Sequence, residues 1–308
     1  MAPVFSKIPL HSLNILAVDD EAFNLEILSE WLLDWGVHVE TAENGQQALA
    51  VLDAAKRRFD AILLDRMMPE MDGLEFLAAM QAHPQWKAIP VIMQSAAATV
   101  DEVQSALSAG IWYYLSKPFD RRKLLSMIET AVTDSVVHQR LRELVNESPR
   151  GEIVQHSMEL QTLAQAQEAA VQLARFVPQS GKAVLGLFEL LVNAIEHGNL
   201  EIGYNDKTRL VNNHQWLEEI ESRSCREAYR DRVVKVSVNE TENDFEYVIE
   251  DEGSGFKSKN YLQLQTHRAA DNHGRGIAFT NQYCFTRLEF FGTGNQVRAY
   301  SAKGVERQ

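Results

Sequence analysis

The chain has 308 residues, 45% hydrophobic and 24% charged, which is ordinary for a globular protein long enough for two domains. Its net charge of −13 argues against non-specific binding to nucleic acid or to an anionic membrane surface. Two cysteines provide no disulfide or zinc framework and favour a cytoplasmic location. We find no apolar run approaching the about 20 residues of a membrane-spanning helix, and no secretion-signal core in the first ten residues.

Residues 1–130 contain five short apolar runs of strand type, separated by helical patterns. The runs are Asn14–Val18, Val37–Val39, Ala61–Leu64, Pro90–Met93 and Trp112–Leu115. Strands that alternate with helices predict an α/β fold with a doubly wound, five-stranded parallel sheet. In such sheets the functional groups collect at the carboxyl ends of the strands.

Polar residues lie within two positions of the ends of four of these runs. They are Asp19 and Asp20, Asp65, Ser95 and Lys117. Three carboxylates that meet in one pocket repel each other unless a cation is present, and oxygen ligands suit Mg²⁺. A nearby lysine can pair with an added phosphoryl group. The pattern predicts a site that moves a phosphoryl group onto a carboxylate oxygen.

These residues, with the sequence Leu64-Asp65-Arg-Met-Met-Pro69-Glu-Met-Asp-Gly73, resemble the receiver domain of two-component response regulators over residues 10–130. The resemblance implies Asp65 as phosphoacceptor and a cognate sensor histidine kinase as phosphodonor. It implies a phosphate-pairing lysine, a hydroxyl switch and an aromatic switch at Lys117, Ser95 and Tyr114. It also implies Mg²⁺ ligands at Asp19, Asp20, Asp65 and the Met67 carbonyl, and a cis peptide before Pro118.

A long helix is predicted from a cap at Asp120 to about Glu147, and residues 131–150 form a connector. Its first apolar stripe, expected to pack on the receiver sheet, is Leu125, Ile128, Val132 and Val136. Its second stripe, about 120° away, is Val137, Leu141 and Leu144. The partner of the second stripe is either the same helix of another chain or the C-terminal domain. We expect a homodimer through this half of the helix.

In residues 151–308, a helical pattern runs through Phe188–Gly198. Its apolar stripe is Val184, Phe188, Val192 and Ile195, and Glu189, Asn193 and His197 recur on a different face. Two later stretches are rich in glycine: Asp251-Glu-Gly253-Ser-Gly255 after a predicted strand, and Gly274-Arg275-Gly276 at a predicted helix start. Glycine permits positive φ and close approach of the backbone to a ligand, and helix starts suit phosphate.

In this order, the three stretches resemble the motifs of the GHKL (Bergerat-type) ATP-binding family, which includes gyrase and histidine kinases, over about residues 151–303. The resemblance implies ATP and Mg²⁺ as cofactors, Asn193 as Mg²⁺ ligand and Asp251 as acceptor for the adenine amino group. Glu189 corresponds to the acid at the phosphate end, and subfamilies differ in whether it is a general base. The other implied nucleotide-binding residues are His197, Gly253, Gly255, Gly274, Arg275 and Gly276.

The rest of this domain predicts an α/β sandwich with a mixed or antiparallel sheet. The expected strands are Met158–Leu160, Val233–Val238, Phe245–Ile249, and a hairpin of Leu288–Phe291 and Gln296–Tyr300. A helix is expected over Thr162–Phe176. Residues 205–231 are interpreted as a helical insertion anchored by Trp216, Leu217 and Ile220.

Neither His138 nor His156 has the acidic neighbour and downstream proline of a histidine-kinase phosphoacceptor, so both are expected to face solvent. The combination of FELLVNAIEHGN, EDEGSGF and HGRGI most resembles the anti-sigma-factor serine kinases of partner-switching systems. The hypothesis is a receiver-controlled protein serine/threonine kinase acting on a small anti-anti-sigma-like antagonist or a sigma factor. The alternatives are a non-catalytic, ATP-gated sequestering protein and a regulator that docks on a histidine kinase.

Overall fold

The computed structural model describes residues 10–96, 111, 113–147, 156–213, 215–257, 261–262 and 274–304. The chain forms two compact units. The boundary lies inside one helix, so that the N-terminal unit runs to Val137 and the C-terminal unit begins at His138. In the part of the chain that is described, no helix has both the length and the apolarity needed to cross a membrane.

The N-terminal unit is built on a parallel sheet with the strand order β2-β1-β3-β4-β5, which confirms the predicted five-stranded parallel sheet. The strands are β1 Asn14–Val18, β2 His38–Ala42, β3 Ala61–Asp65, β4 Val91–Ser95 and β5 Tyr113–Ser116. The first helices are η1 Leu10–Ser12, α1 Ala22–Leu33, α2 Gly45–Ala54 and α3 Gly73–Ala82. The switch in strand order places the carboxyl ends of β1 and β3 beside one crevice.

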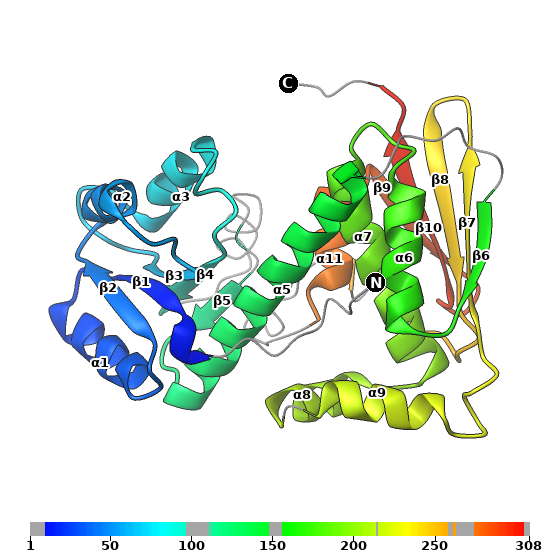
Figure 1. Cartoon of the computed structure of the whole chain (residues 1–308), viewed down its shortest axis with the longest axis horizontal. Coiled ribbons are helices and arrows are strands. Elements are labelled where there is room, and N and C mark those ends of the chain that lie inside the picture. The colour runs from blue at the N-terminus through cyan, green and yellow to red at the C-terminus, as the bar shows by residue number, and fades with distance from the viewer. Residues whose placement is uncertain are drawn as a thin grey trace. The chain divides into compact units, whose positions relative to one another are not determined.

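The central strands β1, β3 and β4 are buried along their whole length. Such continuous apolar strands require helices on both faces of the sheet. Helices α2 and α3 lie on one side, and α1 and the start of α5 lie on the other (Figure 1). Asn44 caps α2, and Asp72 forms a capping box with Glu75 at the start of α3.

Helix α5, Arg121–Glu147, begins with the predicted cap, because the Lys123 amide donates to Asp120 Oδ1 at 2.8 Å. Its N-terminal half belongs to the first hydrophobic core. The residues buried there are Leu124, Met127, Ile128, Ala131 and Val132. The predicted stripe was therefore misplaced by part of a turn: Val136 is 49% exposed, whereas Leu124 and Met127, which the prediction omitted, are buried.

The C-terminal half of α5 belongs to the second unit. Leu141 is fully buried, Leu144 and Val145 are buried, and His138 stacks on Phe279 of the same unit. Of the two partners considered for the second stripe, its own C-terminal domain is the one observed. The expected homodimer seam is thus covered within one chain, and His138 does not simply face solvent as expected.

The C-terminal unit contains a second sheet, with the order β6-β7-β8-β10-β9 and every neighbouring pair antiparallel. Its strands are β6 His156–Leu160, β7 Val234–Glu240, β8 Asp244–Glu250, β9 Arg287–Phe291 and β10 Gln296–Ala302. Its helices are α6 Leu163–Ala174, α7 Ser180–Asn193, the π-helix η2 Ala194–Asn199, α8 Tyr204–Asn212, α9 Trp216–Ser224, α11 Gly276–Phe279 and the π-helix η4 Thr280–Cys284.

One face of this sheet carries α6 and α7 (Figure 1). The fully buried Tyr247 of β8 crosses between the layers and donates its hydroxyl to the Leu173 carbonyl of α6 at 3.2 Å. The insertion is helical as predicted, and Ile220 is buried. Leu217, however, was expected to be an anchor and is 39% exposed.

Candidate functional site

The first candidate site lies where β1, β3 and β5 end. Lys117, just after β5, places its Nζ atom 2.8 Å from Asp19 Oδ2 and 2.5 Å from Asp65 Oδ1. Both carboxyl groups are buried, with Asp19 1% and Asp65 8% exposed. Asp19 and Asp65, which are far apart in the sequence, therefore share the ammonium group of Lys117.

Each carboxylate also has a second set of donors that fixes its orientation. Asp65 Oδ2 accepts the Met67 amide at 2.8 Å. Asp19 Oδ1 accepts the Asn24 side-chain amide at 2.9 Å and the Glu21 amide at 3.0 Å. Asn24 was not predicted to be a site residue. Its position one turn into the helix after Asp19 is the signal that could have indicated this role.

The charge balance of the pocket is uneven, because one lysine serves two buried acids. Burial lowers the pKa of Lys117, but the hydrogen bonds and charges of Asp19 and Asp65 outweigh it, and the net shift is upward. Burial raises the pKa of Asp65; the Lys117 hydrogen bond and charge oppose this without cancelling it. The result is a firmly protonated lysine beside a comparatively basic carboxylate.

The other predicted residues of this pocket lie around it. Ser95 is buried at the end of β4, and its carbonyl accepts the Lys117 amide at 2.8 Å. Tyr114 is buried in the neighbouring strand β5. The Lys117–Pro118 peptide is cis, as predicted. Asp20 and Met67 have exposed side chains.

The donor chemistry of this pocket fits Mg²⁺. Among the residues that the structure describes, no three acidic, histidine or cysteine side chains are grouped closely enough to hold a metal by themselves. Mg²⁺, however, usually needs only one or two carboxylates and retains several waters. Asp19 and Asp65 supply two carboxylates with one lysine between them, so the buried site has an excess of negative charge that a divalent cation would balance.

The second candidate site is the polar face of the α7–η2 segment. From Ala183 to Leu200, all of which the structure describes, Glu189, Asn193 and His197 are the only residues that are not fully buried. The predicted apolar stripe is buried, as are the residues between its members. Asn193 Nδ2 donates to Glu189 Oε1 at 3.2 Å. His197 Nδ1 donates to the Ile202 carbonyl at 2.5 Å. The three residues form one accessible row on an otherwise buried helix.

Asp251 lies at one end of this row. A side chain on Gly198 would collide with the Asp251 carboxyl group, and one on Gly253 would collide with the Gly198 carbonyl, so these residues are in direct contact. Asp251 Oδ1 accepts the Gly253 amide at 2.9 Å, and within the described residues Oδ2 has no hydrogen-bond partner. Burial raises the pKa of Asp251 to about 6, and the charge of Glu250 adds to the shift.

The Gly274-Arg275-Gly276 turn reaches the other end of the row. Gly276 packs directly on the Glu189 carboxylate, where any side chain would collide with it. Gly274 and Gly255 have φ values of +85° and +79°, which favour glycine. Arg275, which lies between Gly274 and Gly276 in the sequence, is buried. Sequence segments about 60 and 80 residues from α7 thus meet opposite ends of its polar face.

Three residues that were not predicted support this arrangement. Asn199 Oδ1 accepts the Glu252 amide at 2.8 Å. In the turn between β9 and β10, Asn295 donates its side chain to the Asp251 carbonyl at 3.0 Å and accepts the Asp251 amide at 2.9 Å. The fully buried Glu196 accepts Lys207 Nζ and Trp216 Nε1, which attaches the insertion to η2. Glu196 and Asn199 both lie within the FELLVNAIEHGN stretch and so had a local sequence signal, whereas Asn295 had none.

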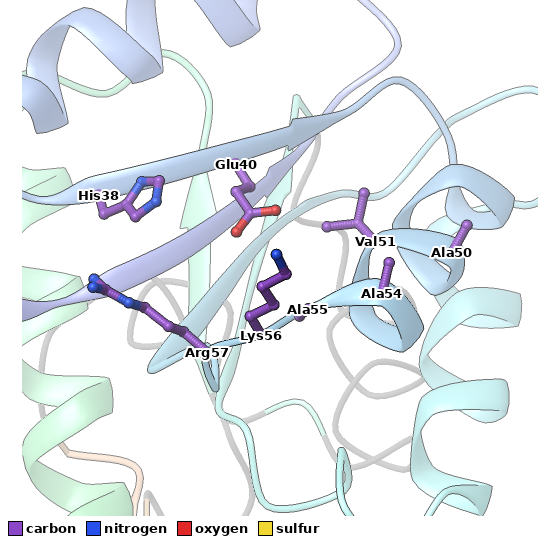
Figure 2. Close-up of a pocket in the computed structure, with 8 residues that line it drawn as sticks. All are labelled: His38, Glu40, Ala50, Val51, Ala54, Ala55, Lys56 and Arg57. Atoms are coloured by element: carbon purple, nitrogen blue, oxygen red, sulfur yellow. The ribbon is translucent and has the colours of Figure 1, made fainter.

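A separate hollow of about 540 Å³ lies in the N-terminal unit, between β2 and the end of α2. Figure 2 shows that Lys56 extends toward the Glu40 carboxylate across it, with Arg57 and His38 at one side and alanines at the other. None of the predicted site residues lines this hollow. We assign no function to it.

The raised pKa of Asp251 makes a prediction about stability. The native pKa of about 6 exceeds the ordinary 3.8, so the carboxyl group contributes stability below pH 4 that is lost as the pH rises through 6. Asp251→Asn keeps an acceptor for the Gly253 amide and carries no charge. At pH 8 it should raise the free energy of unfolding of the C-terminal unit by about 1–3 kcal/mol, and the gain should vanish near pH 3.5.

Hydrogen exchange of the β7 and β8 amides measures this free energy. The exposed Asp231→Asn is the control and should change it by less than about 0.5 kcal/mol at either pH. A gain of the same size at both pH values would show that burial of the Asp251 charge is not its cause.

Comparison with known proteins concerns the N-terminal unit. The family model described as the response regulator receiver domain matches residues 15–129. The transcriptional regulatory protein ZraR of Klebsiella oxytoca is 37% identical over 137 residues, which are 44% of this chain and 29% of that protein. The signal transduction histidine-protein kinase BarA of Escherichia coli (strain K12) is 32% identical over 139 residues, 44% of this chain and 15% of that protein.

The matched region therefore spans less than a third of either relative. Among solved structures, the chemotaxis protein CheY4 of Vibrio cholerae is 35% identical, with a TM-score of 0.37, and the match covers 39% of this chain and 98% of that chain. The family match coincides with the parallel sheet, the shared lysine and the two buried acids described above. Residues 15–129 of this chain are a response regulator receiver domain of the two-component type.

Proposed function

We propose that this chain is a response regulator in which phosphorylation of Asp65 controls an ATP-binding output domain, and that the output is a protein serine/threonine kinase of the GHKL type. One observation supports the output part of the proposal most strongly. Two glycine-rich stretches, distant in sequence, contact opposite ends of the single accessible polar row of α7 and η2.

At the receiver site, a carboxylate oxygen of Asp65 attacks phosphorus, and the bond from phosphorus to the donor's leaving group breaks, giving an acyl phosphate. The raised pKa of Asp65 makes this oxygen a better nucleophile than an ordinary carboxylate. Lys117 is already within ion-pair distance of Asp65 and would pair with the added phosphoryl oxygens. Asp19, Asp65, the Met67 carbonyl and, at the rim, Asp20 would hold Mg²⁺, which supplies positive charge when bound.

A histidine kinase is the phosphodonor that this domain implies. Receiver domains generally take their phosphoryl group from such kinases, and BarA, which is similar to residues of this domain, is named as one. ZraR is named as a transcriptional regulator, but that name applies to a protein of which the match covers only 29%. The net charge of −13 gives no support for DNA as the target of this chain.

The C-terminal unit offers a site of suitable length for a nucleoside triphosphate. Glu189 and Gly198 are nine residues apart along the helical segment, or about 13 Å at a rise of 1.5 Å per residue. At the Gly198 end, Asp251 Oδ2 can accept the amino group of adenine. At the Gly276 end, the backbone of the Gly274-Arg275-Gly276 turn packs on Glu189, and its N–H groups would contact the phosphates. The Asn193 side-chain oxygen, which its bond to Glu189 does not use, would hold Mg²⁺.

For phosphoryl transfer, the hydroxyl oxygen of a serine or threonine would attack the γ-phosphorus, and ADP would leave. Glu189 is partly accessible and lies beside Gly276, so it can accept the proton of the attacking hydroxyl. The target would be a small anti-anti-sigma-like antagonist protein or a sigma factor. The partly exposed helices α8 and α9, anchored through Glu196, offer a surface for such a partner.

The first test concerns Asp65. In the presence of Mg²⁺, labelled acetyl phosphate should phosphorylate the chain, and Asp65→Asn should abolish the label because the amide nitrogen replaces the nucleophilic oxygen. The exposed Asp53→Asn should retain full labelling. Label of equal intensity on Asp65→Asn would reject this residue as the acceptor.

The second test concerns nucleotide choice. ATP with Mg²⁺ should bind about 10- to 100-fold more tightly than GTP by calorimetry, because GTP lacks the amino group that Asp251 accepts and such a bond is worth about 1.5–3 kcal/mol. Asn193→Ala should weaken binding of Mg²⁺-ATP, whereas the exposed Asn243→Ala should leave it unchanged. Equal affinities for ATP and GTP would eliminate the proposed adenine contact.

The third test separates a kinase from a sequestering protein. With γ-labelled ATP and candidate antagonist proteins, we expect acid-stable label on a serine or threonine of the partner. Glu189→Gln should slow the transfer about 100-fold or more, as loss of a general base does. Binding of ATP without transfer would instead favour the ATP-gated sequestering protein. Acid-labile label on His138 or His156 would identify a histidine kinase.

A further inference from the structure

The C-terminal half of α5 contacts the segment that follows the proposed phosphate end of the nucleotide site. The His138 ring stacks on Phe279, with centroids 5.7 Å apart and an angle of 8° between the planes. Phe279 is the last residue of α11, whose first residue is Gly276. One helical turn therefore separates the residue that His138 contacts from the residue that packs on Glu189.

The contact continues into a small aromatic cluster. Phe279 stacks on Tyr283 of η4 at 5.3 Å, and Lys182 of α7 lies over the Tyr283 ring at 5.2 Å. The backbone of α11 is fixed to its start, because the Phe279 amide donates to the Arg275 carbonyl at 2.9 Å. A displacement of the Phe279 backbone would consequently act on the Gly274-Arg275-Gly276 turn.

The His138 side chain is suited to stack on Phe279 because its ring is neutral. Burial lowers its pKa to about 4, and the nearby positive charge of Arg142 acts in the same direction. At neutral pH the ring is uncharged. Leu141 and Val145, three and seven residues further along α5, are buried in the same unit and hold this half of the helix in place.

The same helix begins in the receiver core, where Leu124, Met127 and Ile128 are buried with β4 and β5 residues. A change in the receiver that displaces or rotates α5 would therefore act on His138 through continuous helical backbone. Coupling of this kind requires an element that both sites can bias. Helix α5 meets that requirement because it contributes to both cores.

We infer that His138 is a positioning residue for the Gly274-Arg275-Gly276 turn, and that its stack on Phe279 is where the phosphorylation state of Asp65 reaches the output domain. The expected consequence, control of nucleotide binding, rests on the proposed function. The contact itself can be tested without nucleotide.

The experiment compares hydrogen exchange of the full chain with and without beryllofluoride and Mg²⁺, used as a stable substitute for the phosphoryl group. In the parent, beryllofluoride should change exchange in residues 276–284 about fivefold or more, the lower range of measured allosteric coupling. His138→Ala and, from the other partner, Phe279→Leu should lose this response. His138→Phe keeps an aromatic ring and should retain it.

Two internal controls keep the result interpretable. The loop after Asp65 should respond to beryllofluoride in every variant, and the β7 and β8 amides should show that the C-terminal unit remains folded. Gln139→Ala, at the exposed neighbouring position on α5, should respond like the parent. A response in both His138→Ala and Phe279→Leu equal to that of the parent, or no response in the parent, would overturn the inference.

The nucleotide result is read separately. In the parent, beryllofluoride should change the affinity for Mg²⁺-ATP by a similar factor, and His138→Ala should bind Mg²⁺-ATP without that change. If the parent shows the exchange response but binds no ATP, the proposed output fails and the positioning role of His138 stands. If ATP affinity responds equally in the parent and in His138→Ala, the positioning role fails and the ATP site stands.

Discussion

One helix, α5, supplies side chains to two separate hydrophobic cores, and this constraint links the two units of the chain. Its first half buries Leu124 and Met127 in the receiver, and its second half buries Leu141 and Val145 in the C-terminal unit. Because protein interiors are closely packed, a shift of either half of α5 disturbs the core in which that half is buried. The regulatory proposal depends on this property more than on any single polar contact.

The receiver site is organised by a deficit of positive charge. Two buried carboxylates share the single positive charge of Lys117. One negative charge therefore remains in the pocket, and a bound cation would balance it. Burial, with a smaller contribution from the Asp19 charge, raises the pKa of Asp65, which suits its proposed role as a nucleophile. Stability and reactivity therefore have one origin here: burial keeps the acids away from water, and the lysine prevents their repulsion from opening the pocket.

In the C-terminal unit, the main feature is the polar face of α7 and the two glycine-rich loops that contact it. Helix α7 is nearly surrounded by protein, and its few accessible side chains are polar. Glycines allow two loops to approach it so closely that Gly198 touches Asp251 and Gly276 touches Glu189. Asn295 then fixes the Asp251 backbone from the opposite hairpin. The accessible row is thus bounded by backbone at both ends, and the proposed nucleotide site uses this row.

The sequence alone determined the features that depend on local periodicity. These include the five receiver strands, the acids and lysine at their ends, and the Glu189, Asn193 and His197 row, since a period of 2 or 3.6 residues assigns each side chain to a face. Tertiary structure decided whatever required a distant partner. It paired β6 with β7, exposed Val136 and Leu217, recruited Asn199 and Asn295, and placed the His138 ring on Phe279. It also covered Leu141 within its own chain, because an apolar stripe specifies that it must be buried but not which surface buries it.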